Sequence, residues 1–100
     1  MSDLNTVLDE YRNHIVKDYY HRYTGIVDPD RYKVEFEPGS KYIKVVSVSW
    51  GSRSVHSFIE KSNGDIWRAA SWKAPARNFA RGNVFAPATY INRTTWTGVV

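Results

Sequence analysis

The sequence predicts a single α+β domain, with an N-terminal amphipathic helix packed on an antiparallel meander of about four strands and an irregular basic C-terminal segment. Three observations predict it: an apolar period near 3.6 at the start, a period of two from Tyr32, and tight-turn signals between the later runs. Short connections between consecutive strands favour antiparallel pairing. The 100 residues are 42% apolar, enough to bury one core but too few for two domains.

The helix is expected over residues 3–24. Its apolar stripe recurs at spacings of three and four and consists of Leu4, Val7, Leu8, Tyr11, Ile15, Tyr19 and Tyr23. Asp3 or Asn5 is suited to cap its start, because either side chain can accept from free backbone N–H groups. Thr24-Gly25 is a plausible end, and Asp28-Pro29-Asp30 predicts an extended or turning connection.

The first hairpin is expected to join strands 32–37 and 41–50 through Pro38-Gly39 in a type II turn. This turn would set Val34 opposite Ile43. The helix is expected to pack on the apolar face of the hairpin, formed by Tyr32, Val34, Phe36, Ile43 and Val45. Apolar residues change parity at Val46, which leaves open either a bulge or coverage of both faces.

The second hairpin is expected to join strands 54–60 and 66–72, after a turn at 51–53. Asn63-Gly64 predicts a type I′ turn, which needs positive φ at both central residues. Pairing outward from this turn sets Arg68 opposite Ile59, so the pattern does not decide which face of this hairpin is buried. Beyond Trp72 the pattern is irregular. Pro75 could begin a helical turn ending near Gly82, a loop being the alternative, and residues 94–97 could add an edge strand.

Charge is distributed unevenly along the chain. Residues 1–60 hold eight Lys and Arg against nine Asp and Glu, whereas residues 61–100 hold six basic residues and a single acid, Asp65. Basic groups neutralise phosphates and exposed aromatic rings stack unpaired bases, so the 67–93 segment predicts binding to single-stranded nucleic acid. The expected phosphate contacts are Arg68, Lys73, Arg77, Arg81 and Arg93, and the expected stacking residues are Trp72 and Phe79. The alternative is that the aromatics form core and the cations a solvated rim.

Two other functions compete with nucleic-acid binding. A protein-interaction module would use Trp and Arg as interface anchors. A binder of a phosphorylated small molecule would place Arg77 and Arg81 on one side of a helical turn, with Gly82 and Asn83 beside them. The string is no P-loop, because Lys followed by Ser or Thr after a glycine-rich loop is missing.

The stretch from Asn63 to Ala76 contains A-A-S-W-K-A-P-A and is followed by Arg81-Gly82-Asn83. It resembles small uncharacterised proteins of tailed bacteriophages that carry a similar stretch. The resemblance implies a viral origin and a place in the host cytoplasm, with the virion as the alternative. On this basis an interaction module would be a virion component or would modulate a host protein. It transfers no catalytic residue and no chemistry.

Neither a metal, a cofactor nor catalysis is expected. Without cysteine there is no thiol nucleophile and no Cys-ligated zinc. His14 and His21 would lie about 10 Å apart along the helix, too far to share a metal, and His56 has no identifiable partner. Glu35 and Glu37, about 7 Å apart on one strand face, resemble a solvated charged face more than an acid/base pair.

Nucleophilic and membrane-bound classes are disfavoured as well. The serines lack a neighbouring His–acid arrangement and the G-x-S-x-G elbow. No apolar run reaches 18 residues, so no membrane span is expected. The N-terminus lacks the basic and apolar regions of a signal peptide, which favours the cytoplasm.

Overall fold

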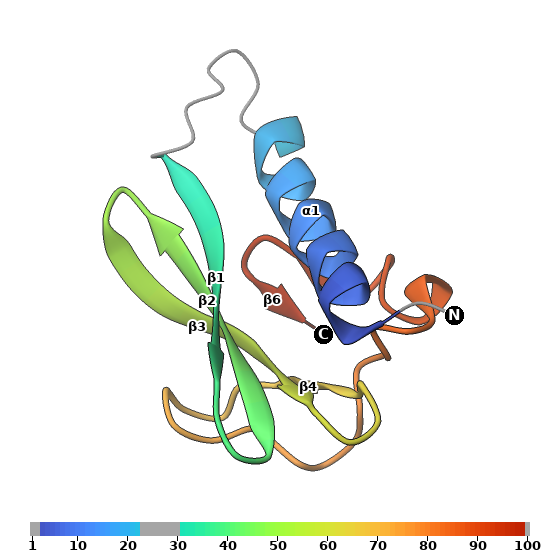
Figure 1. Cartoon of the computed structure of the whole chain (residues 1–100). Coiled ribbons are helices and arrows are strands. Elements are labelled where there is room, and N and C mark those ends of the chain that lie inside the picture. The colour runs from blue at the N-terminus through green and yellow to red at the C-terminus, as the bar shows by residue number, and fades with distance from the viewer. Residues whose placement is uncertain (1–2, 23–30, 100) are drawn as a thin grey trace.

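The computed structural model describes residues 3–22 and 31–99, and it confirms the α+β fold, with the N-terminal helix packed on a four-stranded antiparallel sheet (Figure 1). The elements are α1 (Leu4–Arg22), β1 (Tyr32–Pro38), β2 (Tyr42–Ser49), β3 (Ser52–Glu60), β4 (Ile66–Arg68), the 3₁₀ helix η1 (Pro87–Thr89), β5 (Thr94–Thr95) and β6 (Gly98–Val99). The strand order is β1-β2-β3-β4, and β5 pairs with β6 separately. No helix among the described residues has the length and apolar character needed to cross a membrane.

Asp3 caps α1, as one of the two expected candidates. Its Oδ1 accepts the backbone N–H of Thr6 at 2.8 Å, which satisfies one of the free donors of the first turn. The expected stripe is buried at Val7, Leu8, Tyr11, Ile15 and Tyr19. The predicted end at Thr24-Gly25, the stripe residue Tyr23 and the 28–30 connection lie outside the described residues.

The core lies between α1 and the sheet face that we call the inner face. The helix stripe packs there with Tyr32, Val34, Ile43 and Val45, as the pattern predicted. Ring contacts reinforce the packing, since Tyr19 stacks on Tyr32 with centroids 4.3 Å apart. The irregular C-terminal region also enters this core, through Val84, Tyr90 and Val99.

The first hairpin has a different register from the expected one. Pro38 extends β1 and pairs with Ile43, while Val34 pairs with Ser47. The chain reverses at residues 40–41, where the N–H of Gly39 donates to the Tyr42 carbonyl at 2.8 Å. The predicted turn is therefore wrong by two residues and the predicted pairing register by four. The inner face is unchanged, because an even shift keeps every side chain on its own side.

The parity change at Val46 comes from coverage of both faces, because β2 keeps its regular alternation and the bulge lies in the next strand, β3. Val45 pairs with Ser57 and Val46 with Val55, so His56 is the extra residue of a bulge in β3. Val45 and Val46 point to opposite faces, and both are fully buried. The sheet is thus covered on both sides at its centre.

The type I′ turn predicted at Asn63-Gly64 is found instead at the earlier turn, for which no type was predicted. Ser49 pairs with Ser52, and Trp50 and Gly51 between them have φ values of 53° and 83°, the signature of a type I′ turn. The turn therefore precedes the expected 51–53 position. At the expected type I′ site the loop is longer: the N–H of Glu60 donates to Asp65, and Gly64 alone has a positive φ. A Cβ at Gly64 would lie 2.6 Å from the Phe85 ring, so this loop also needs glycine for space.

The fourth strand is much shorter than predicted. It ends at Arg68 instead of Trp72, with Ile66 opposite Ile59 and Trp67 opposite Phe58. Arg68 pairs with Ser57, two residues from its expected partner. Residues 75–82 form turns and extended chain rather than a helical turn, and the residues expected to add an edge strand pair in the separate β5–β6 ribbon.

Candidate nucleic-acid interface

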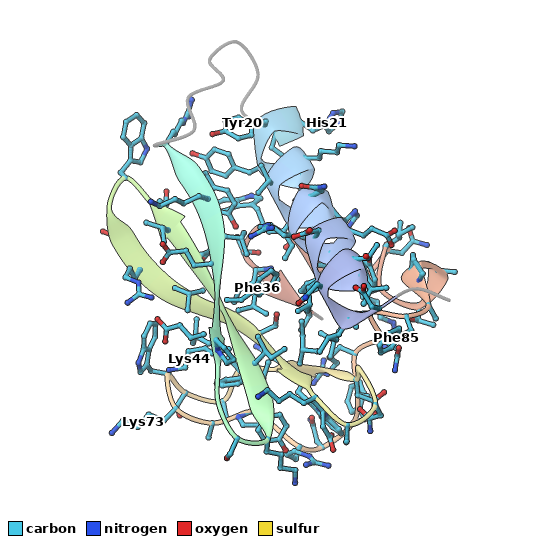
Figure 2. The ribbon with its side chains drawn as sticks, viewed as in Figure 1. Tyr20, His21, Phe36, Lys44, Lys73 and Phe85 are labelled. Atoms are coloured by element: carbon cyan, nitrogen blue, oxygen red, sulfur yellow. The ribbon has the colours of Figure 1, made fainter. Side chains whose placement is uncertain are left out.

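The sheet face turned away from α1, which we call the outer face, carries charge beside aromatic rings. Register places Lys44, Phe58 and Trp67 on this side, one next to another across three strands. Residues 69–79, which we call the 69–79 loop, return across it from the end of β4. The side chains of Lys44 and Lys73 extend on the side of the sheet away from α1 (Figure 2).

The 69–79 loop is tied down at its base and presents Trp72. Ala69 bridges Pro75, and the N–H of Ala70 donates to Ala74 at 3.0 Å, which closes a tight reversal around residues 71–73. The Trp72 side chain is 39% exposed. The Lys44 Nζ lies 4.2 Å and the Arg53 guanidinium 5.8 Å from its ring centroid. Trp72 is therefore an accessible ring with two cations against it.

Beside this ring lies a hollow of about 350 Å³ between the β1–β2 turn and the 69–79 loop. Lys41, Lys44 and Lys73 line it, together with Tyr42 and Phe58. Glu37 also borders the hollow, and it pairs with Lys44 at 4.0 Å and with Arg53. Three lysines that line one hollow make a site suited to phosphate oxygens, which accept from several donors at once.

Arg77 lies on the same face but is already engaged. Its guanidinium lies 4.4 Å from the Trp67 ring centroid, and its Nη2 lies 3.7 Å from Glu60 Oε1. Glu60 is 9% exposed and also accepts from Trp67 Nε1 at 3.1 Å. Arg77 thus neutralises a nearly buried carboxylate. Its main role in this arrangement is structural.

Arg81 and Phe79 form a separate pair. Arg81 is 6% exposed, and its guanidinium lies 3.9 Å from the Phe79 ring centroid. Its Nη2 donates to Asn78 Oδ1 at 3.4 Å, and within the described residues its Nε has no hydrogen-bond partner. Half-exposed Phe79 therefore covers a guanidinium that is held in the fold. Arg77 and Arg81 do not share the helical turn expected for them.

The last two predicted phosphate contacts lie elsewhere. Arg68 pairs with Ser57, which directs its side chain to the inner side, and it borders a smaller hollow of about 260 Å³ with His56. Arg93 follows η1 and donates its N–H to Tyr90, whose ring packs against Tyr11 of α1. The structure thus gathers Trp72, Lys73 and Arg77 on one face and leaves Arg68 and Arg93 away from it.

The sequence reasoning missed the cations that complete the interface. Neither Lys44 nor Arg53 was predicted as a site residue, and Arg53 was expected in the 51–53 turn, yet both contact Trp72. Lys41 joins them at the hollow. A signal was present in the alternation of the first hairpin, which places Lys44 opposite the apolar side. It could be connected to Trp72 only once the 69–79 loop was known to cross that side.

His56 belongs to a buried hydrogen-bond chain rather than to the outer face. Its Nε2 lies 2.7 Å from the Thr95 carbonyl, which only accepts, so this nitrogen carries the proton. Nδ1 then accepts from Ser57 Oγ at 2.9 Å, and Ser57 accepts from the Tyr11 hydroxyl at 2.8 Å. Burial lowers the pKa of His56 to about 4 and raises that of Tyr11. Both groups are neutral near pH 7 and hold the bulge in place.

Among residues 3–22 and 31–99 no three metal-ligating side chains lie together. A family model described as Family of unknown function (DUF7717) matches residues 4–100, nearly the whole chain. No curated protein and no solved structure gives a significant match. The comparisons therefore assign the chain to a family without supplying a reaction or a ligand.

Proposed function

We propose that this chain, which belongs to the DUF7717 family of unknown function, binds single-stranded nucleic acid on the outer face of its sheet. One observation carries the proposal: an accessible Trp72 ring lies against two cations and beside a lysine-lined hollow. An aromatic ring stacks any unpaired base, and the cations around it neutralise the phosphates on either side. The combination fits a binder with little sequence preference.

The binding mode follows from the geometry of the ring. A base stacking on Trp72 displaces the Lys44 ammonium from one ring face and frees it for a phosphate. Lys41 and Lys73 border the neighbouring hollow, so they meet the next phosphate along the strand. Arg77 keeps its ion pair with Glu60 and thereby holds the 69–79 loop against the sheet. The proposed site thus combines both halves of the sequence.

Fluorescence anisotropy with a labelled oligothymidylate at low salt tests the proposal. Trp72→Ala should weaken binding about tenfold or more, because a stacked base is worth roughly 1–3 kcal/mol. Trp50→Ala is the matched control, since it removes another exposed Trp outside this face. Equal affinities for the two variants would exclude Trp72 as the stacking residue.

Salt dependence tests the lysines separately. Lys73→Ala should reduce the slope of log K against log salt by about 0.7, the value for one phosphate contact with a single strand. Lys61→Ala, which removes an exposed lysine from the β3–β4 loop, should leave the slope unchanged. If wild type fails to bind the oligonucleotide even at low salt, the proposal is wrong.

A protein partner is the second candidate, because Trp50 occupies an unusual position. Trp50 is 70% exposed and has a φ of 53°, a conformation usually left to Gly or Asn. Backbone strain at an exposed aromatic residue suggests a binding contact with a partner that offsets the energetic cost of the strain. In that case Trp50→Ala, rather than Trp72→Ala, would abolish capture of the partner.

A phage origin and a role in the host cytoplasm are part of either proposal and rest on the sequence resemblance alone.

A further inference from the structure

Within residues 3–22 and 31–99, no strand pairs with the edge of β1 that faces away from β2. Arg31 accepts the N–H of Trp50 at 3.0 Å, and Gly39 donates to Tyr42 at 2.8 Å, so odd-numbered residues of this strand bond to β2. The N–H and C=O groups of Tyr32, Val34 and Phe36 therefore point away from the sheet. Among the described residues one contact reaches these groups, from the Tyr20 hydroxyl to the Tyr32 carbonyl at 3.4 Å. Such an edge is a template for strand addition.

An apolar groove runs along this edge. It has a volume of about 390 Å³ and lies between α1 and β1, which run side by side in Figure 1. Val16 and Tyr20 line it from the helix, and Tyr32 and Val34 line it from the strand. A strand added to β1 would lie along these groups, with every second side chain on their side of the sheet.

The charges of β1 identify the occupant. We propose that a second copy of this chain adds through its own β1, antiparallel, about a two-fold axis at Val34. This register pairs Tyr32 with Phe36 and Lys33 with Glu35 of the other copy, and the two-fold repeats each pair. The residues whose backbone groups face the free edge then form the hydrogen-bonded pairs, as antiparallel geometry requires.

Neighbouring registers of the same parity are disfavoured by like charges. A shift of two residues in one direction sets Lys33 against Lys33, and in the other direction it sets Glu35 against Glu35. Like charges directly opposite in a ladder are destabilising. Each shifted register also keeps two opposite pairs, Arg31 with Glu35 or Lys33 with Glu37, but in the register centred on Val34 no like charges meet. The dimer would extend the sheet across two copies and does not depend on nucleic-acid binding.

Sedimentation velocity and light scattering over a concentration series test the dimer. Wild type should form a dimer that weakens with added salt. Lys33→Glu and Glu35→Lys should each raise the dimer dissociation constant about tenfold or more, because each sets like charges opposite at two places. Both positions are at least partly exposed, Glu35 also lies 3.5 Å from Arg53 of its own chain, and thermal melts will show that the variants fold.

Mixing the two variants gives the decisive result. A K33E chain carries two glutamates and an E35K chain two lysines at these positions, so the mixture should form a heterodimer as tightly as wild type. Lys61→Glu is the control charge reversal and should dimerise normally. A wild type that stays monomeric up to about 1 mM, single variants that dimerise like wild type, or a mixture without recovery would each overturn the proposal.

Discussion

The inner and outer faces of the sheet use aromatic rings in different ways. On the inner face most ring contacts are with other rings, as in the 4.3 Å stack of Tyr19 on Tyr32. On the outer face most ring contacts are with cations, as where Lys44 lies 4.2 Å from Trp72. Ring–ring packing excludes water and fixes the helix, whereas cation–ring contacts near the surface can be exchanged for a ligand. The same strands thus supply stability on one side and binding chemistry on the other.

The largest loss of stability is expected from truncation on the inner face. Ile15→Ala should lower the free energy of unfolding by about 2–5 kcal/mol, because Ile15 is fully buried and its loss leaves a cavity. Urea denaturation measures this effect, and Lys17→Ala on the exposed side of the same helix is the control. A loss below about 1 kcal/mol would mean that the helix–sheet contact is not the main core.

Acid should weaken the protein through His56. Its pKa is about 4 in the fold and about 6.5 in the unfolded chain, so between these values the unfolded chain binds the extra proton. The free energy of unfolding therefore falls as pH drops from about 6.5 to 4, by up to about 3 kcal/mol. Above about pH 6.5 this group adds no pH dependence.

Unfolding free energies at pH 7 and pH 4.5 measure the His56 contribution. His56→Gln should be less stable than wild type at pH 7 and should lose less of its stability on acidification. Subtracting the loss of unfolding free energy in the variant from the loss in wild type cancels the contribution of the carboxylates, which titrate in both proteins. Parallel losses would show that another group causes the acid sensitivity.

On the outer face a smaller effect is expected from Arg77. Arg77→Ala should cost about 1 kcal/mol, because it leaves nearly buried Glu60 without its counter-charge while Trp67 still donates to it. The double variant with Glu60→Gln should recover part of this loss. The salt dependence of oligonucleotide binding should change less than in Lys73→Ala. A large change in that slope would instead make Arg77 a phosphate contact.

Periodicity predicted the helix and the inner face because both depend only on which residues are apolar. The register of the first hairpin could not be predicted from periodicity, because Pro38 continues β1 where a turn was expected. Turn type failed for a related reason. Trp50 takes the left-handed conformation that the sequence suggested for Asn63. Local propensity does not show which strained position the surrounding sheet will support.

The candidate site was predictable only in part. Trp72 and Lys73 were named from the basic C-terminal segment, but Lys44 and Arg53 come from the half of the chain with no net positive charge. Charge counted along a sequence cannot show which strands lie side by side. Burial of Arg81 was equally hidden, because nothing local distinguishes it from Arg77.

The smallest effect on stability and the largest on binding should come from the same substitution. Trp72→Ala should lower the free energy of unfolding by about 1 kcal/mol or less, because the ring is 39% exposed and its contacts are cations that water can replace. Oligonucleotide affinity should nevertheless fall about tenfold or more. Ile15→Ala should show the reverse, with affinity kept under conditions where it stays folded. If Trp72→Ala instead destabilises the fold as much as Ile15→Ala does, the outer face is a second core and not a binding surface.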